Sequence, residues 1–138
     1  MTPRRAQSTR QASLVDARAY LSKAREFLHA ATISLEAENH VASVGNSVHA
    51  GIAAADAISA ARAGTVWRGE HSQAPGHLEA AAGRDGAQAA RQLRRLIPLK
   101  TRAEYDPDPV SAAQARNALK AAGRLVGIAD GVTASTNG

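Results

Sequence analysis

Apolar residues recur along the first part of the chain at the spacing of an amphipathic helix. From residue 14 to residue 35 they follow one another at alternating steps of three and four, a heptad pattern that places them on one helix face. The residues on this face, called the heptad seam below, are Leu14, Ala17, Leu21, Ala24, Leu28, Ala31 and Leu35. Ser13 precedes the seam as an N-cap, with Asp16 at the third helical position. The helix that covers the seam belongs either to this chain or to a second protomer.

A second long helix is predicted from His40 to Ala63, where valines and isoleucines are interspersed with many alanines and two glycines. Such a mixture suits a helix that packs against neighbours on several sides, and Gly64 is a typical residue at which it stops. The segment Thr65–Gly76 predicts a loop, in which Trp67 covers one end of the bundle. A short helix is expected over His77–Ala82.

The second half of the chain predicts two more long helices. After a break at Gly83–Gly86, a third helix starts near Ala87, and Pro98 is expected to kink or end it because proline lacks a backbone donor. Ser111 and Gln114 form a capping box that opens the last helix. The predicted fold class is therefore all-α, an up-and-down helical bundle of four main helices and one short helix.

Composition supports a single helical domain. The chain has 138 residues, of which 33 are alanine and only four are aromatic, and alanine has the highest helix propensity. We predict one domain over residues 13–130, between disordered tails at 1–12 and 131–138. The absence of cysteine excludes thiol nucleophiles and disulfide scaffolds. No apolar stretch has the length of a membrane span, so we expect a cytoplasmic protein.

Positive charge is concentrated in one part of the chain. The formal net charge is +5, and five cations lie within twelve residues that contain no acid. These cations are Arg91, Arg94, Arg95, Lys100 and Arg102. They predict a surface that contacts the phosphate backbone of RNA or DNA. The alternative is a solvated face whose cations pair with acids of neighbouring helices.

Two polar residues of the second predicted helix suggest a pocket. Asp56 and His49 lie seven positions apart, and therefore near the same helix face. We expect Asp56 to pair with Arg102. This pair is either a structural ion pair or part of a pocket in which His49 carries a proton or holds a polar ligand.

Two histidines of the predicted loop region have the chemistry of metal ligands. His71 and His77 flank a Pro-Gly pair, and a metal requires a third ligand, for which Glu70 or Glu79 has suitable chemistry. Loop histidines beside glycines are usually solvated. We therefore predict no metal and no other cofactor.

Three segments carry a resemblance to a known family. They are Ser22–Leu28 (SKAREFL), Val48–Ile58 (VHAGIAAADAI) and Lys100–Asp106 (KTRAEYD). Together with the order of the elements, they resemble the HEPN domain superfamily, in particular small stand-alone bacterial members, over about Val15–Ala129. The resemblance implies a helical bundle that forms a homodimer. Many members are metal-independent RNases of toxin–antitoxin or antiphage systems, with an arginine followed after four to six residues by a histidine and commonly a nearby tyrosine.

This chain departs from the family's RNase motif. If Glu104 and Tyr105 match the residues after the family's histidine, Ala103 stands in place of the histidine and Pro98 in place of the arginine. Alanine cannot transfer a proton and proline carries no charge. The resemblance therefore implies a non-catalytic binding or regulatory module. It would contact RNA, a nucleotide or a cognate partner protein such as a nucleotidyltransferase.

Two alternatives follow from the same residues. One is a divergent HEPN ribonuclease in which Arg102, Tyr105 and His49 act, with Asp56 and Glu104 as supporting polar residues. The other is an antitoxin-like subunit that binds a neighbouring gene product and no RNA.

Overall fold

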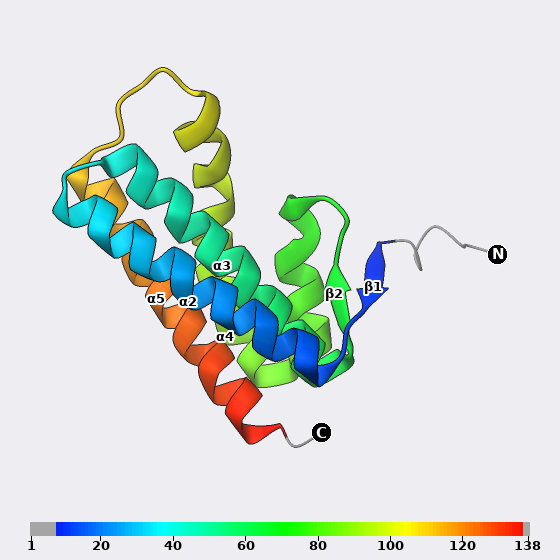
Figure 1. Ribbon diagram of the computed structural model, residues 1–138. Helices are drawn as coiled ribbons and strands as arrows, with labels where there is room; N and C mark the ends of the chain where they lie inside the picture. Colours follow the sequence, from blue (N-terminus) through cyan, green and yellow to red (C-terminus); the bar gives the residue numbers. More distant parts are fainter. Residues whose placement is uncertain (1–7, 137–138) are drawn as a thin grey trace.

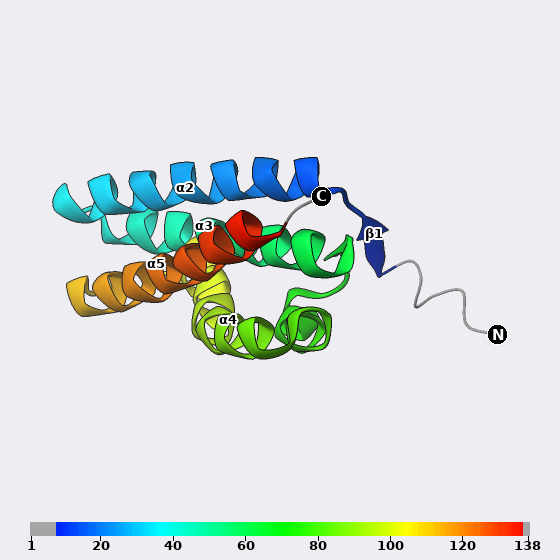
Figure 2. The ribbon, with the colours of Figure 1, turned by 90° about the horizontal axis from the view of Figure 1, so that it is seen from below.

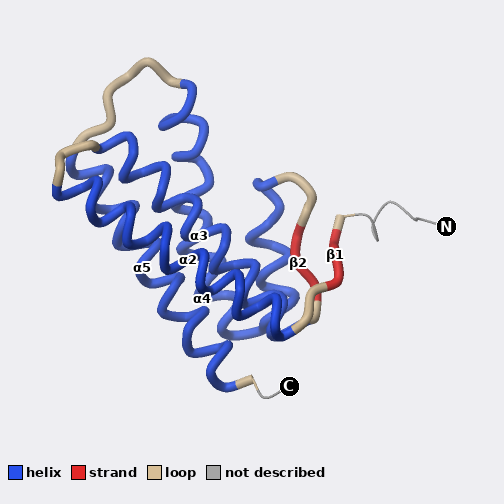
Figure 3. The backbone as a smooth tube through the Cα atoms, viewed as in Figure 1, coloured by secondary structure: helices blue, strands red, loops and turns tan. Residues whose placement is uncertain are grey.

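The protein is a helical bundle with a small two-stranded sheet at one side (Figures 1 and 3). The computed structural model describes residues 8–136. The elements in chain order are β1 (Thr9–Gln11), α2 (Leu14–Glu36), α3 (His40–Ala63), β2 (Thr65–Trp67), the short 3₁₀ helix η1 (His71–Gln73), α4 (Ala74–Tyr105) and α5 (Ala112–Ser135). The prediction of an all-α bundle is confirmed. No helix among the described residues has the length and hydropathy that a membrane span requires.

Helix α3 is the central element. It packs against α2, α4 and α5, and α2 and α4 lie on opposite sides of it (Figure 2). The bounds predicted for this helix are confirmed, and Gly64 ends it in the left-handed conformation with φ of 69°. Because neighbours surround α3, its small residues let three helices approach closely. A side chain on Gly51, for example, would overlap the end of Leu96 from α4.

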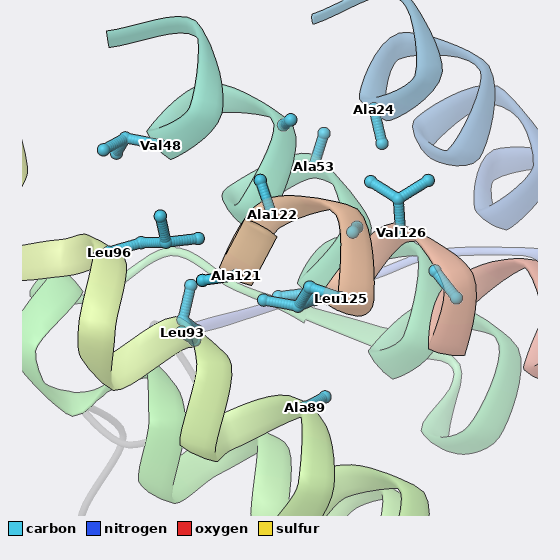
Figure 4. Close-up of a cluster of buried hydrophobic side chains, with 14 of the residues drawn as sticks. Ala24, Val48, Ala53, Ala89, Leu93, Leu96, Ala121, Ala122, Leu125 and Val126 are labelled. Atoms are coloured by element: carbon cyan, nitrogen blue, oxygen red, sulfur yellow. The ribbon is translucent and has the colours of Figure 1, made fainter. Parts of the chain in front are cut away.

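The heptad seam is covered by helices of the same chain. Its residues Ala17, Leu21, Ala24 and Ala31 are buried, and α2 packs on α3 and α5. Figure 4 shows how the core is built from short side chains, with residues of all four helices meeting around Leu93, Leu96 and Leu125. The predicted caps are also confirmed, since Ser13 with Asp16 and Ser111 with Gln114 form capping boxes.

Two segments predicted as tails are ordered where the structure describes them. Thr9–Gln11 forms β1, which pairs antiparallel with β2 in the predicted loop, so that Thr9 lies opposite Trp67. At the other end, α5 continues to Ser135 instead of stopping at residue 130. The remaining tail positions, 1–7 and 137–138, lie outside the described residues. Burial of Val66 beside Ala17 and Ala60 gives this small sheet its apolar support.

The predicted short helix and third helix form a single element. Helix α4 runs from Ala74 to Tyr105, and the expected break is a kink at Gly83, where φ is 57° and ψ is −128°. The helix does not end at Pro98, which lies inside α4 and is exposed. Because proline has no backbone N–H, the carbonyl oxygen four positions earlier loses its helical hydrogen bond. On an exposed face, water donates a hydrogen bond to that oxygen instead.

Candidate functional site

Four cations line a groove between α4 and α5, called the basic groove below. Arg91 and Arg95 come from α4, and Lys120 and Arg124 come from α5. Each pair is four positions apart, which places both members of a pair on one helix face. The groove consists of two shallow hollows of about 440 and 450 Å³. Among the described residues that line these hollows there is no acid.

Three acids of α4 and α5 pair with cations outside the groove. Glu79 pairs with Arg94, and Asp130 pairs with Arg25. Asp85 pairs with Arg62 at 3.3 Å. Within residues 8–136, none of the four groove cations forms an ion pair. Their charge therefore faces solvent in the free protein.

Helix α5 also exposes backbone along the groove. Gly123 lies three positions after Lys120, and Gly127 lies three positions after Arg124, so each glycine is on the same face as its cation. A Cβ atom placed on either glycine would meet nothing within 4 Å. The two glycines therefore leave open surface beside Lys120 and Arg124.

The predicted basic edge is divided among several places. Arg91 and Arg95 lie in the basic groove, whereas Arg94 is paired with Glu79. Lys100 lies beside His71, with 3.4 Å between Nζ and Nδ1. Arg102 borders a small hollow formed with Val44 and Gln114. Successive residues of a helix point in different directions, so five cations within twelve residues do not share one face.

The expected ion pair between Asp56 and Arg102 is wrong. Asp56 pairs instead with Arg68, with 3.3 Å between Nη1 and Oδ2. Arg102 lies near Val44, which is twelve positions before Asp56 on α3 and therefore about 18 Å away along the helix axis. Arg68 reaches the carboxylate because β2 follows α3 after a single glycine and runs back beside it.

Arg68 is held in place by several contacts. Its Nη1 donates to the backbone oxygen of Trp67 and its Nη2 to the hydroxyl of Tyr20, both at 2.8 Å. The guanidinium carbon also lies 5.8 Å from the centre of the Tyr20 ring, within the range of a cation–π contact. Burial raises the pKa of Asp56 to about 6, although the charge of Arg68 and its hydrogen bond oppose that shift.

Asp56 and Arg68 border an apolar cavity between α3, β2, η1 and α4, called the polar-ended pocket below. Its volume is about 110 Å³. Trp67, His71 and His77 also line it. The Trp67 and His77 rings are tilted against each other with their centres 5.2 Å apart. Trp67 therefore forms a wall of this pocket, with its indole nitrogen donating to the backbone oxygen of Glu70 at 2.8 Å.

Both histidines of the pocket favour the neutral form. Burial lowers the pKa of His77. Burial, and then the charge of Lys100, lowers the pKa of His71. His77 Nε2 lies 3.1 Å from the hydroxyl of Ser59. Within the described part of the chain, no group of three metal-ligating side chains is close enough to hold a metal ion.

The residues suggested for a ribonuclease site are not brought together. His49 is exposed and its ring packs against Phe27 of α2, with the ring centres 5.2 Å apart. Tyr105 is 77% exposed at the end of α4, and Glu104 is exposed beside it. No hydrogen bond in the described chain joins His49, Arg102 or Tyr105 to one another. His49 therefore packs on α2, whereas Arg102 and Tyr105 lie three positions apart at the end of α4.

Sequence reasoning missed part of both sites. The spacing of Lys120 and Arg124 was a usable signal, since two cations four positions apart on an amphipathic helix share its polar face. The grouping of Arg68, His71 and Trp67 around Asp56 depends on β2 pairing with β1, which helical periodicity does not reveal.

Comparisons with known protein families and curated proteins identify no relative of this chain. No model of a protein family matches the chain, and a search of curated proteins returns no significant match. The HEPN resemblance therefore stays a hypothesis based on three short segments and their order.

Proposed function

We propose that this protein is a non-catalytic binding module that contacts the phosphate backbone of RNA through the basic groove. The observation that carries the proposal is the set of four unpaired cations, Arg91, Arg95, Lys120 and Arg124, on two adjacent helices. Unpaired cations favour binding of a phosphate backbone, because each contact with a phosphate releases counterions from the nucleic acid.

The composition of the groove suits recognition of the backbone without sequence preference. Aromatic side chains, on which unpaired bases stack, are absent from the described residues that line it. Gln88, Gln92 and Asn117 supply neutral polar groups beside the cations. Hydrogen bonds from such amides to phosphate or sugar oxygens position a nucleic acid but carry no sequence information.

The groove itself supports binding in preference to catalysis. Arginine and lysine stay protonated at neutral pH and are poor general bases. The three residues proposed for the ribonuclease alternative come from α3 and the end of α4, and no hydrogen bond within the described chain joins His49 to the other two. The HEPN relationship, the homodimer and the toxin–antitoxin setting stay predictions beside this proposal.

The proposal is tested by RNA binding of matched charge variants. Arg91→Gln combined with Arg124→Gln removes two groove cations, and we expect the affinity for a labelled single-stranded RNA to fall about thirtyfold at low salt, since each lost phosphate contact is worth roughly 1 kcal/mol. Fluorescence anisotropy measures the change. The control is Arg18→Gln with Lys23→Gln, which removes the same charge from exposed positions of α2.

The control separates a groove from general charge attraction. Helix α2 lies on the opposite side of α3 from α4, so the control variant should bind RNA within about twofold of the wild type (Figure 2). An equal loss of affinity in both variants would contradict the proposal. Gel analysis of the same RNA after incubation should show no cleavage products, and cleavage would favour the ribonuclease alternative.

A further inference from the structure

The polar-ended pocket combines apolar walls with a few polar groups. The apolar side chains come from α3 and α4, and they are Ile52, Ala55, Leu78, Leu93 and Ile97. Atoms around such a hollow lack van der Waals partners on one side, so a molecule that fills it restores those contacts. The volume of about 110 Å³ has the scale of one six-membered ring, since an engineered apolar cavity of about 150 Å³ binds benzene. Size and lining therefore suit a compact molecule with an apolar body.

Trp67 is the largest side chain of the lining and is held in position. Its indole nitrogen donates to the backbone oxygen of Glu70 at 2.8 Å. Its ring also lies directly against Gly69, because a Cβ atom added to this glycine would overlap Cζ2 and Cε2 of the indole. The His77 ring, tilted by 32° against the indole, extends the same wall. A fixed aromatic wall favours an aromatic ligand, since pairs of rings attract each other beyond the burial of their area.

The charges that line the pocket already cancel. Among the described residues of the lining, Asp56 and Arg68 are the charged ones, and they form an ion pair with 3.3 Å between Oδ2 and Nη1. Arg68 is held there by its hydrogen bond to the hydroxyl of Tyr20 at 2.8 Å. His71 and His77 favour the neutral form, because burial lowers the pKa of both. A charged ligand would therefore leave water without gaining an opposite charge that is free to pair with it.

We propose that the polar-ended pocket binds a small uncharged molecule with a single aromatic ring. The ring fills the hollow between Trp67 and the apolar walls of α3 and α4. One hydroxyl group on the ligand suits the pair of Asp56 and Arg68, because a hydroxyl both donates and accepts hydrogen bonds. The proposal goes beyond RNA binding and does not depend on it, since the pocket and the basic groove share no lining residue.

Four probe molecules test the ligand class on the full-length protein. Benzyl alcohol is uncharged and aromatic, benzylamine is a cation, benzoate is an anion, and cyclohexylmethanol is uncharged but not aromatic. The titrations are done at about pH 8, where Asp56 is ionised because burial raises its pKa only to about 6. Trp67 is the only tryptophan of the chain, so its fluorescence reports binding at the pocket wall.

The expected order of affinity follows from the lining. Benzyl alcohol should bind with a dissociation constant of about 1 mM or lower, which is ordinary for so small a ligand. Benzylamine and benzoate should each bind about tenfold more weakly or worse, and cyclohexylmethanol about fivefold more weakly. No fluorescence change at tens of millimolar benzyl alcohol would overturn the proposal. Equal affinity for either ion, or for cyclohexylmethanol, would overturn the assigned ligand class.

Gly69→Ala tests the aromatic wall. The φ angle of Gly69 is not positive, so the overlap of the added Cβ with the indole is the main effect of the substitution. The ring must move, and benzyl alcohol should bind about tenfold more weakly. The control is Gly45→Ala on α3, outside the pocket, where an added Cβ meets nothing within 4 Å. If both variants bind like the wild type, the wall does not contact the ligand and the proposal is wrong.

Asp56→Asn tests the balance of charge. It replaces the carboxylate by a neutral amide of similar shape and leaves Arg68 without its counter-ion. The affinity for benzoate relative to that for benzyl alcohol should therefore rise about fivefold or more. Asp85→Asn is the matched control, because it breaks the ion pair with Arg62 outside the pocket and should leave this ratio unchanged. The same ratio in both variants would contradict the argument that the ligand is uncharged.

This proposal and the RNA-binding proposal fail independently. Arg91→Gln with Arg124→Gln should bind benzyl alcohol as the wild type does, and Gly69→Ala should bind RNA within about twofold of the wild type, because the altered residues line different hollows. The thermal unfolding transition of each variant checks its folding. Gly69 lies in the loop between β2 and η1, so its variant keeps the test valid even if Asp56→Asn unfolds.

Discussion

Asp56→Asn is expected to change the pH dependence of stability by about 2 kcal/mol between pH 4 and pH 7. The pKa of Asp56 is raised from 3.8 to about 6 because the folded protein buries its carboxylate. In that pH window the folded state holds the proton more tightly than the unfolded state does. The contribution of Asp56 to stability is therefore fully present below pH 3.8 and is lost as the pH rises through 6.

The measurement compares the free energies of unfolding of the two proteins in urea at several pH values. Relative to Asp56→Asn, the wild type should lose stability steadily from pH 4 to pH 7. The effects of His71 and His77, whose lowered pKa values act in the opposite direction, are common to both proteins and largely cancel in the difference. Parallel profiles for the two proteins would contradict the burial of an ionisable carboxylate beside Arg68.

Gly86→Ala is expected to lower the free energy of unfolding by about 2 kcal/mol. The kink at Gly83 folds the first turns of α4 back over Gly86, and an added Cβ would overlap the backbone oxygen of Leu78. A backbone atom cannot yield as a flexible side chain does, so the cost is near the upper end of overpacking, about 3 kcal/mol. Alanine recovers roughly 1 kcal/mol through its higher helix propensity.

Gly76→Ala is the matched control for this prediction. Gly76 also lies in α4, its φ is not positive, and an added Cβ would meet nothing within 4 Å. Only the propensity effect then applies, so this variant should be as stable as the wild type or slightly more stable. Chemical denaturation of both variants measures the difference. If Gly86→Ala is as stable as Gly76→Ala, the close contact between Gly86 and the backbone of Leu78 is contradicted.

Local sequence signals predicted most of the helical architecture. The bounds of α3 follow from an apolar, small-residue segment that ends at Gly64, and the capping boxes at Ser13 and Ser111 fix the starts of α2 and α5. The continuity of α4 was missed because Gly83 and Pro98 are helix breakers in isolation. Leu78 and Leu93 pack into one core, and this packing keeps the segments before and after Gly83 together in spite of the two helix breakers.

The sites were predicted less completely, for a physical reason. Arg91 and Arg95 could be assigned to a basic surface because their spacing on one helix is a local property. The partner of Asp56 depends on contacts between elements: Arg68 reaches it only because the strand Thr65–Trp67 turns back along α3 and pairs with Thr9–Gln11. Such contacts have no periodic signature in the chain.

The salt dependence of RNA binding tests the central claim most directly. If the four cations of the basic groove each neutralise a phosphate of single-stranded RNA, the logarithm of the association constant should fall against the logarithm of salt concentration with a slope of about −3. Arg91→Gln with Arg124→Gln should reduce the slope to about half, and Arg18→Gln with Lys23→Gln should leave it unchanged. A slope near zero, or the same slope in both double variants, would contradict the account.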